Sequence, residues 1–94
     1  MHKINEEYLN NLYSSLASIE NVDEARRFLS DLLTYQELES MAQRIEVAIL
    51  LRQGKSYVDI NQKTGVSTAT ICRVSKSLNY GDGGYNDILG KIGK

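Results

Sequence analysis

The sequence predicts an all-α fold of five to six helices, and three observations lead to this prediction. Proline is absent from all 94 residues, so no helix is interrupted by a residue that lacks a backbone N–H. Apolar residues recur every three or four positions along most of the chain, which is the spacing of one face of an α-helix. Hydroxyl and amide side chains precede these segments, and glycines follow two of them, as is typical of helix starts and ends.

Two amphipathic helices are expected in the first third of the chain. The first runs from Asn5 to about Ile19, and the second is capped by Asn21 or Asp23 and continues to about Leu33. Acidic residues lie in both first turns, where the helix dipole favours them, so capping and solubility explain their presence. The apolar residues expected to face inward in the second helix are Val22, Ala25, Phe28, Leu29, Leu32 and Leu33.

The longest predicted helix begins at a capping box, Thr34 to Glu37, and runs to about Gln53, just before Gly54. Its apolar residues start as one stripe and spread around most of the helix near its C-terminal end. A helix that is apolar nearly all round has to be covered on several sides. We therefore expect a homodimer, with residues 5–53 as its helical dimerisation core. Cover by the rest of the same chain is the alternative.

A helix-turn-helix is predicted at residues 56–79 of what reads as a single domain. Ser56 can cap a short helix that ends near Thr64, and Gly65 follows where the chain needs a positive φ. Ser67 can then cap a second helix that begins at Thr68. Apolar residues fall where these helices would pack on each other and on their support, namely Ile60, Val66, Ile71, Val74 and Leu78. Residues 80–94 form a glycine-rich tail with at most one weak helix, near residues 86–91.

The second short helix would present a face of small and polar residues to a DNA groove. With Ile71 and Val74 turned inward, the helical period turns Thr68, Ala69 and Cys72 outward. Small side chains let the helix backbone approach base edges, so we expect these three residues to read bases. The residues expected on the phosphate backbone are Ser67, Arg73 and Lys76, with Lys55 and Lys63 as further candidates.

The uneven distribution of charge supports DNA binding. Residues 1–39 hold eight acidic residues against three basic ones, whereas residues 40–94 hold four against eight. Within residues 52–79 five cations oppose a single acid, Asp59, which is the local excess that phosphate binding requires. An ordinary surface helix hairpin is one alternative. Another is a protein-interaction or assembly module that keeps the helix-turn-helix shape without reading DNA, with the acidic half as its binding surface.

No pattern in the sequence indicates an enzyme, a metal site or a membrane protein. The only histidine is His2, and the lone Cys72 has no histidine partner that would make it a nucleophile. One cysteine excludes an intramolecular disulfide, and no long apolar run or leader indicates a membrane span or secretion. We therefore expect a cytoplasmic protein without a cofactor. Cys72 has two interpretations, a small groove-facing residue or a thiol switch.

From Leu32 to Asn79 the order of motifs resembles the Trp repressor superfamily. The shared features are LLT, a long helix with an internal arginine and the end LLRQG, and a helix-turn-helix that contains TATICRVSKSL. The run GVSTATICRVSKSLNYGDGGY is closer still to the small Trp-repressor-related proteins of the YerC/YecD type. The resemblance implies an intertwined homodimer that represses transcription, with two helix-turn-helix heads in successive major grooves. Asn61 departs from the alanine common in such motifs, which leaves the angle between the two helices open.

The resemblance also implies a place for a corepressor. Trp repressor binds its ligand between two arginines, which match Arg44 and Arg73, while Thr34 and Ser77 match positions near the ligand's polar end. Arg73 therefore has two rival roles, a phosphate contact and a ligand contact. Where Trp repressor has a glycine after the second arginine, this chain has Val74, whose branched side chain would fill space that an indole needs. Tryptophan is thus not the expected corepressor, and another small effector or control without a ligand are the alternatives.

Overall fold

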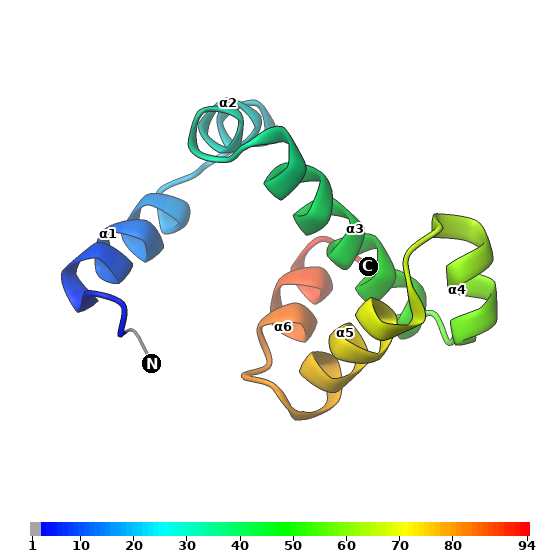
Figure 1. Cartoon of the computed structure of the whole chain (residues 1–94). Helices are drawn as coiled ribbons and strands as arrows, with labels where there is room; N and C mark the ends of the chain where they lie inside the picture. The colour runs from blue at the N-terminus through cyan, green and yellow to red at the C-terminus, as the bar shows by residue number, and fades with distance from the viewer. Residues whose placement is uncertain (1–2) are drawn as a thin grey trace. The chain divides into compact units, whose positions relative to one another are not determined.

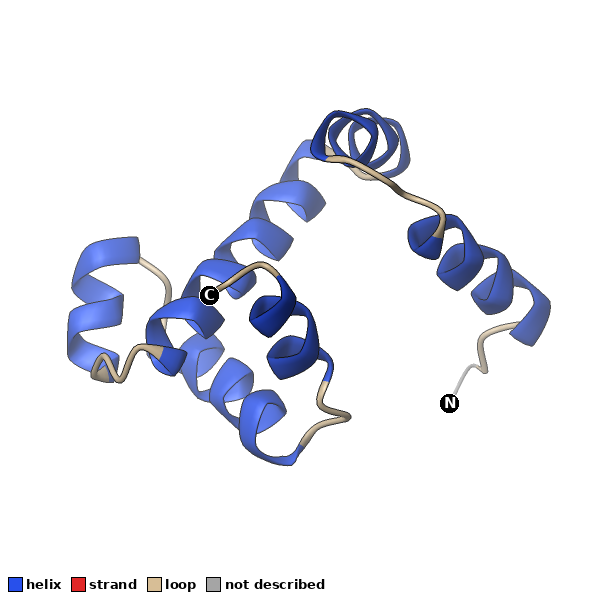
Figure 2. Cartoon of the chain, turned by 180° about the vertical axis from the view of Figure 1, so that it is seen from behind, coloured by secondary structure: helices blue, strands red, loops and turns tan. Residues whose placement is uncertain are grey.

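The computed structural model describes residues 3–94, which contain six α-helices and no strand (Figures 1 and 2). The helices are α1 (Glu6–Ala17), α2 (Val22–Leu32), α3 (Tyr35–Arg52), α4 (Tyr57–Thr64), α5 (Thr68–Tyr80) and α6 (Gly84–Lys91). The predicted all-α class is therefore confirmed, at the upper end of the expected number of helices. No helix in this range is long and apolar enough to cross a membrane. His2 lies outside the described residues.

Side-chain caps set the starts of four helices. The Asn5 and Asn21 side chains accept backbone N–H groups in the first turns of α1 and α2, so Asn21 rather than Asp23 caps the second helix. Ser56 and Ser67 cap α4 and α5 in the same way. Each cap satisfies an N–H group that has no partner inside its helix, which is why these helices begin where the sequence predicted.

The chain divides into two compact units, residues 1–35 and 36–94. In the first unit, α1 and α2 hold no buried residue. Val22 is 86% exposed, so the expectation that it faces inward is wrong within one chain. Leu12, Leu16 and Leu32 are exposed as well. Both helices are amphipathic, and their apolar faces therefore lack the cover that such faces ordinarily have.

The hydrophobic core lies in the second unit, where α4, α5 and α6 gather around the C-terminal half of α3 (Figure 1). Its buried residues are Val47, Ala48 and Leu50 from α3, Ile60 from α4, Val66 from the turn, Ile71 and Val74 from α5, and Leu89 from α6. Farther toward the start of α3 this cover ends, and Ile45 is 45% exposed. The part of the long helix from Val47 to Leu50 is thus covered by its own chain, whereas Ile45, two residues earlier, is left open.

The terminal helix α6 is longer and better anchored than the weak helix expected near residues 86–91. It begins at Gly84, and its Leu89 is buried in the core. The Asn86 side chain accepts a hydrogen bond from the guanidinium group of Arg52 and donates through Nδ2 to the carbonyl oxygen of Leu78 at 3.2 Å. One amide therefore joins α6 to the ends of both α3 and α5.

Candidate nucleic-acid interface

The turn between α4 and α5 is closed by hydrogen bonds around Gly65. Gly65 has a φ of 73°, and its N–H donates to the carbonyl oxygen of Asn61 at 2.8 Å. The Thr64 hydroxyl donates to the carbonyl oxygen of Ile60 at 2.7 Å and accepts the N–H of Val66 at 3.1 Å. A positive φ strains any residue with a Cβ, so the predicted use of glycine at this position is confirmed.

The side chain of Asn61 bridges this turn. Its Nδ2 donates to the carbonyl oxygen of Val66 at 2.8 Å, in partly buried surroundings. The amide thus connects the last turn of α4 to the residue just before the Ser67 cap of α5. An alanine at this position could not make the bond. This side chain therefore helps to hold the angle between the two helices. The sequence alone had left that angle open.

Helix α5 is rotated as the sequence predicted. Ile71 is fully buried and Val74 is 2% exposed, and both lie in the core. Thr68 and Ala69 are exposed at the N-terminal end of the helix. Cys72 is only half-buried, so it is less open to a ligand than its expected place on the outer face implied. The exposed N-terminal part of α5 is consequently formed by small side chains.

The five residues predicted to contact phosphates are all exposed. Ser67 caps α5, Arg73 and Lys76 lie along it, Lys55 precedes α4, and Lys63 lies in the last turn of α4. In the described part of the chain, Asp23 pairs with Arg26 and Arg27 of α2, and neither ion pair involves any of these four cations. Cations without an acidic partner are free to neutralise an external anion.

The positions that the resemblance assigns to a corepressor have different surroundings. Val74 belongs to the core, Arg44 is half-buried on α3, and Arg73 is exposed on α5. Thr34 belongs to the first unit. Ser77 lines an open pocket of about 540 Å³, whereas Arg44, Arg73 and Val74 do not.

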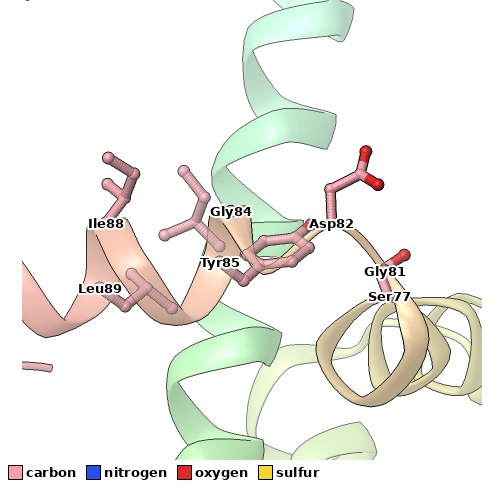
Figure 3. A pocket seen from close by; sticks show the side chains of 8 residues that line it. Ser77, Gly81, Asp82, Gly84, Tyr85, Ile88 and Leu89 are labelled. Carbon is pink, nitrogen blue, oxygen red and sulfur yellow. The ribbon is translucent and has the colours of Figure 1, made fainter.

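This pocket lies where the end of α5 and the start of α6 meet α3 (Figure 3). It is lined by Ile45, Ser77, Gly81, Asp82, Gly84, Tyr85, Ile88 and Leu89. At Gly81 a Cβ atom would lie 2.5 Å from the carbonyl oxygen of Ser77, so the turn that shapes the pocket requires glycine. Sequence reasoning missed the pocket because its lining comes from three helices, although the glycines of the tail marked the turn.

Metal-binding side chains are not gathered in the described residues. No group of three or more histidine, cysteine, aspartate or glutamate side chains lies close enough there to hold an ion. Cys72 is a free cysteine.

In both sequence and structure the chain is similar to known proteins. Residues 7–92 match the model of the family described as Trp repressor protein. The uncharacterized protein YerC of Bacillus subtilis (strain 168) is 43% identical over 90 residues, which are 96% of this chain and 86% of that protein. A solved TrpR-like protein from Eubacterium eligens ATCC 27750 is 44% identical with a TM-score of 0.86, covering 93% of this chain and 90% of that one. A solved protein from Staphylococcus aureus is 39% identical with the same TM-score of 0.86, covering 93% of this chain and 87% of that one.

Proposed function

The chain belongs to the Trp repressor family, and on that premise we propose that it is a sequence-specific regulator of transcription that binds double-stranded DNA. We propose further that it acts as a homodimer on a two-fold operator and represses transcription. The observation that carries this proposal is the N-terminal face of α5, where Thr68 and Ala69 are exposed beside cations that have no acidic partner. Membership of this family also favours a regulator over an enzyme.

Base reading is assigned to Thr68, Ala69 and Cys72. Small side chains at the start of a recognition helix allow its backbone to lie close to the floor of the major groove. The methyl groups of Thr68 and Ala69 can contact thymine methyls, and the Thr68 hydroxyl can donate or accept a hydrogen bond at a base edge. Cys72 is half-buried, so only part of its side chain is available for such a contact.

Contacts to the phosphate backbone are assigned to Ser67, Arg73, Lys76, Lys55 and Lys63. The first N–H groups of α5 and its helix dipole add positive potential at the same end of the helix. These contacts would supply most of the affinity and fix the register of the protein on the duplex, while carrying no sequence information of their own.

The homodimer is supported by apolar surface that one chain leaves uncovered. Exposed apolar side chains occur on both N-terminal helices and on α3, with Leu16, Val22 and Ile45 as examples. Two copies would bring two recognition helices to half-sites about 34 Å apart or a multiple of that distance. A two-fold operator follows from the two-fold symmetry of such a dimer.

Control by a small effector is a further part of the proposal, with Arg44, Arg73, Thr34 and Ser77 as the residues that would bind it. Val74 argues against tryptophan, because this residue is buried in the core and the resemblance implies that an indole would need space at its position. The proposed effector is therefore a smaller molecule than tryptophan, and control without a ligand is the alternative.

Selection of bound sequences from a random DNA pool, with and without tryptophan, tests the proposal. We expect a two-fold symmetric motif to be enriched equally in both arms. Uniform weak binding that modest salt abolishes would contradict sequence reading and would favour the protein-interaction alternative. Enrichment only in the presence of tryptophan would contradict the argument from Val74.

A further inference from the structure

We infer that Asn61 is a positioning residue that sets the recognition helix α5 at its DNA-binding angle. The inference rests on the proposed function, because it concerns how that same DNA-binding face is held. Asn61 itself lies on α4 and is not assigned any contact with DNA. Its effect would be transmitted through the turn to the exposed residues at the start of α5.

Asn61 makes a hydrogen bond on either side of the pivot at Gly65. Its backbone carbonyl oxygen accepts the N–H of Gly65 at 2.8 Å, which ends α4. Its side-chain Nδ2 donates to the carbonyl oxygen of Val66 at 2.8 Å, which lies beyond the pivot. Asn61 therefore holds the chain both at the pivot residue and at the residue that follows it.

The other hydrogen bonds of the turn act over shorter spans. The Thr64 hydroxyl accepts the N–H of Val66, two residues away, and donates to the carbonyl oxygen of Ile60, four residues away. The Ser67 hydroxyl caps its own helix at the N–H of Thr70. The Asn61 amide spans five residues and holds the carbonyl group that leads directly into the Ser67 cap. Together with the Thr64 hydroxyl, which connects Ile60 to Val66, it therefore constrains the direction in which α5 leaves the turn.

Loss of the Asn61 amide would leave the carbonyl oxygen of Val66 without its donor in partly buried surroundings. An acceptor that loses its donor in partly buried surroundings costs free energy, so the turn would shift or open to reach water. Either change would move Thr68 and Ala69 away from the position from which they meet base edges. The apparent affinity for an operator would then fall in proportion to the fraction of molecules in which α5 keeps its binding position.

The test compares Asn61→Ala and Asn61→Leu with Asn79→Ala. The first two variants remove the donor while leaving side chains of different volume, so a shared effect points to the hydrogen bond rather than to packing. The control removes another asparagine amide, whose Nδ2 donates to the carbonyl oxygen of Ser75 at 3.0 Å within α5, away from the turn. All proteins are studied at a temperature at which circular dichroism shows the full helix content.

Three measurements separate positioning from loss of structure. Affinity for the selected operator is expected to fall about tenfold in both Asn61 variants, which is the effect of one lost hydrogen bond. Affinity for random duplex is expected to stay nearly unchanged, because the cations remain on the surface. Amide hydrogen exchange without DNA is expected to quicken at Gly65 and Val66. The Asn79→Ala variant should match the parent in all three measurements.

Two outcomes would overturn the inference. One is a fully helical Asn61 variant that binds the operator as tightly as the parent does. The other is an equal loss of affinity for operator and random duplex, because that result indicates damage to the fold rather than a misplaced α5. If the parent selects no operator, the proposed function fails instead, and the exchange rates at Gly65 and Val66 still show whether Asn61 holds the turn.

Discussion

Gly65 is the residue on which the local geometry of the helix-turn-helix depends. A Cβ atom added there would meet no other atom within 4 Å, so any strain in a substituted residue comes from its φ of 73° and not from a clash. We expect Gly65→Ala to lower the free energy of unfolding by about 1–2 kcal/mol, which is the strain of a left-handed conformation for alanine. Chemical denaturation at one fixed protein concentration measures this change.

The control for this prediction is Gly90→Ala in α6. Gly90 has no positive φ and open space around its Cα, so alanine should raise the free energy of unfolding by about 0.5–1 kcal/mol through its higher helix propensity. If both substitutions changed the free energy of unfolding in the same direction, the backbone conformation of the two glycines would not explain their effects.

Arg73 has rival roles that the salt dependence of DNA binding separates. If its guanidinium group contacts a phosphate, Arg73→Ala should weaken binding and make the slope of log affinity against log salt shallower by about 0.9. Lys76→Ala should do the same, whereas Lys91→Ala on α6 should leave the slope unchanged. Weaker binding by Arg73→Ala with an unchanged slope would assign the arginine to an effector instead.

At the scale of single helices, α6 depends on one buried side chain. Leu89 is 3% exposed and is the contribution of α6 to the buried core, so Leu89→Ala should lower the free energy of unfolding by about 2–5 kcal/mol. The exposed Lys91 on the same helix provides the comparison, and Lys91→Ala should change stability by no more than about 0.5 kcal/mol. If both variants lowered the free energy of unfolding by similar, small amounts, α6 would not be held in the core by Leu89.

The long helix α3 serves two purposes along its length. Its C-terminal half supplies Val47, Ala48 and Leu50 to the core that supports α4 and α5. Nearer its middle it carries Ile45, which is 45% exposed and lines the open pocket beside α6. A single element therefore supports the proposed DNA-binding face near its C-terminal end and exposes an apolar side chain just before the core begins.

At the scale of the whole molecule, the uncovered apolar surface predicts self-association. Sedimentation equilibrium at several concentrations should give twice the chain mass, and the thermal midpoint should rise with protein concentration because only the dimer covers this surface. Ile45→Lys should shift the equilibrium toward the monomer, since a charge in an apolar interface is costly to desolvate.

The matched control is Gln62→Lys, which places the same charge on an exposed, polar position of α4. We expect this variant to retain the mass of the parent at every concentration. A parent that sediments as a monomer throughout the micromolar range would contradict the homodimer. It would also require another explanation for the exposed apolar faces of α1 and α2.

The sequence alone determined the helices and the rotation of α5, because these features depend on neighbours within a few residues. The caps Ser56 and Ser67, the positive φ of Gly65 and the inward faces of Ile71 and Val74 follow from local hydrogen bonds and helical periodicity. For the same reason, the exposure of Thr68 and Ala69 follows from the sequence.

Only the tertiary structure decided which hydrogen bonds and packing contacts join the helices to one another. The bond from Asn61 to Val66 and the link that Asn86 makes between α6, α3 and α5 join groups whose distance no periodicity specifies. Helix propensity made the glycine-rich tail look weak, yet burial of Leu89 and these side-chain bonds stabilise α6. Packing and hydrogen bonds between separate helices arise only when the chain has folded, so their geometry is absent from the linear pattern.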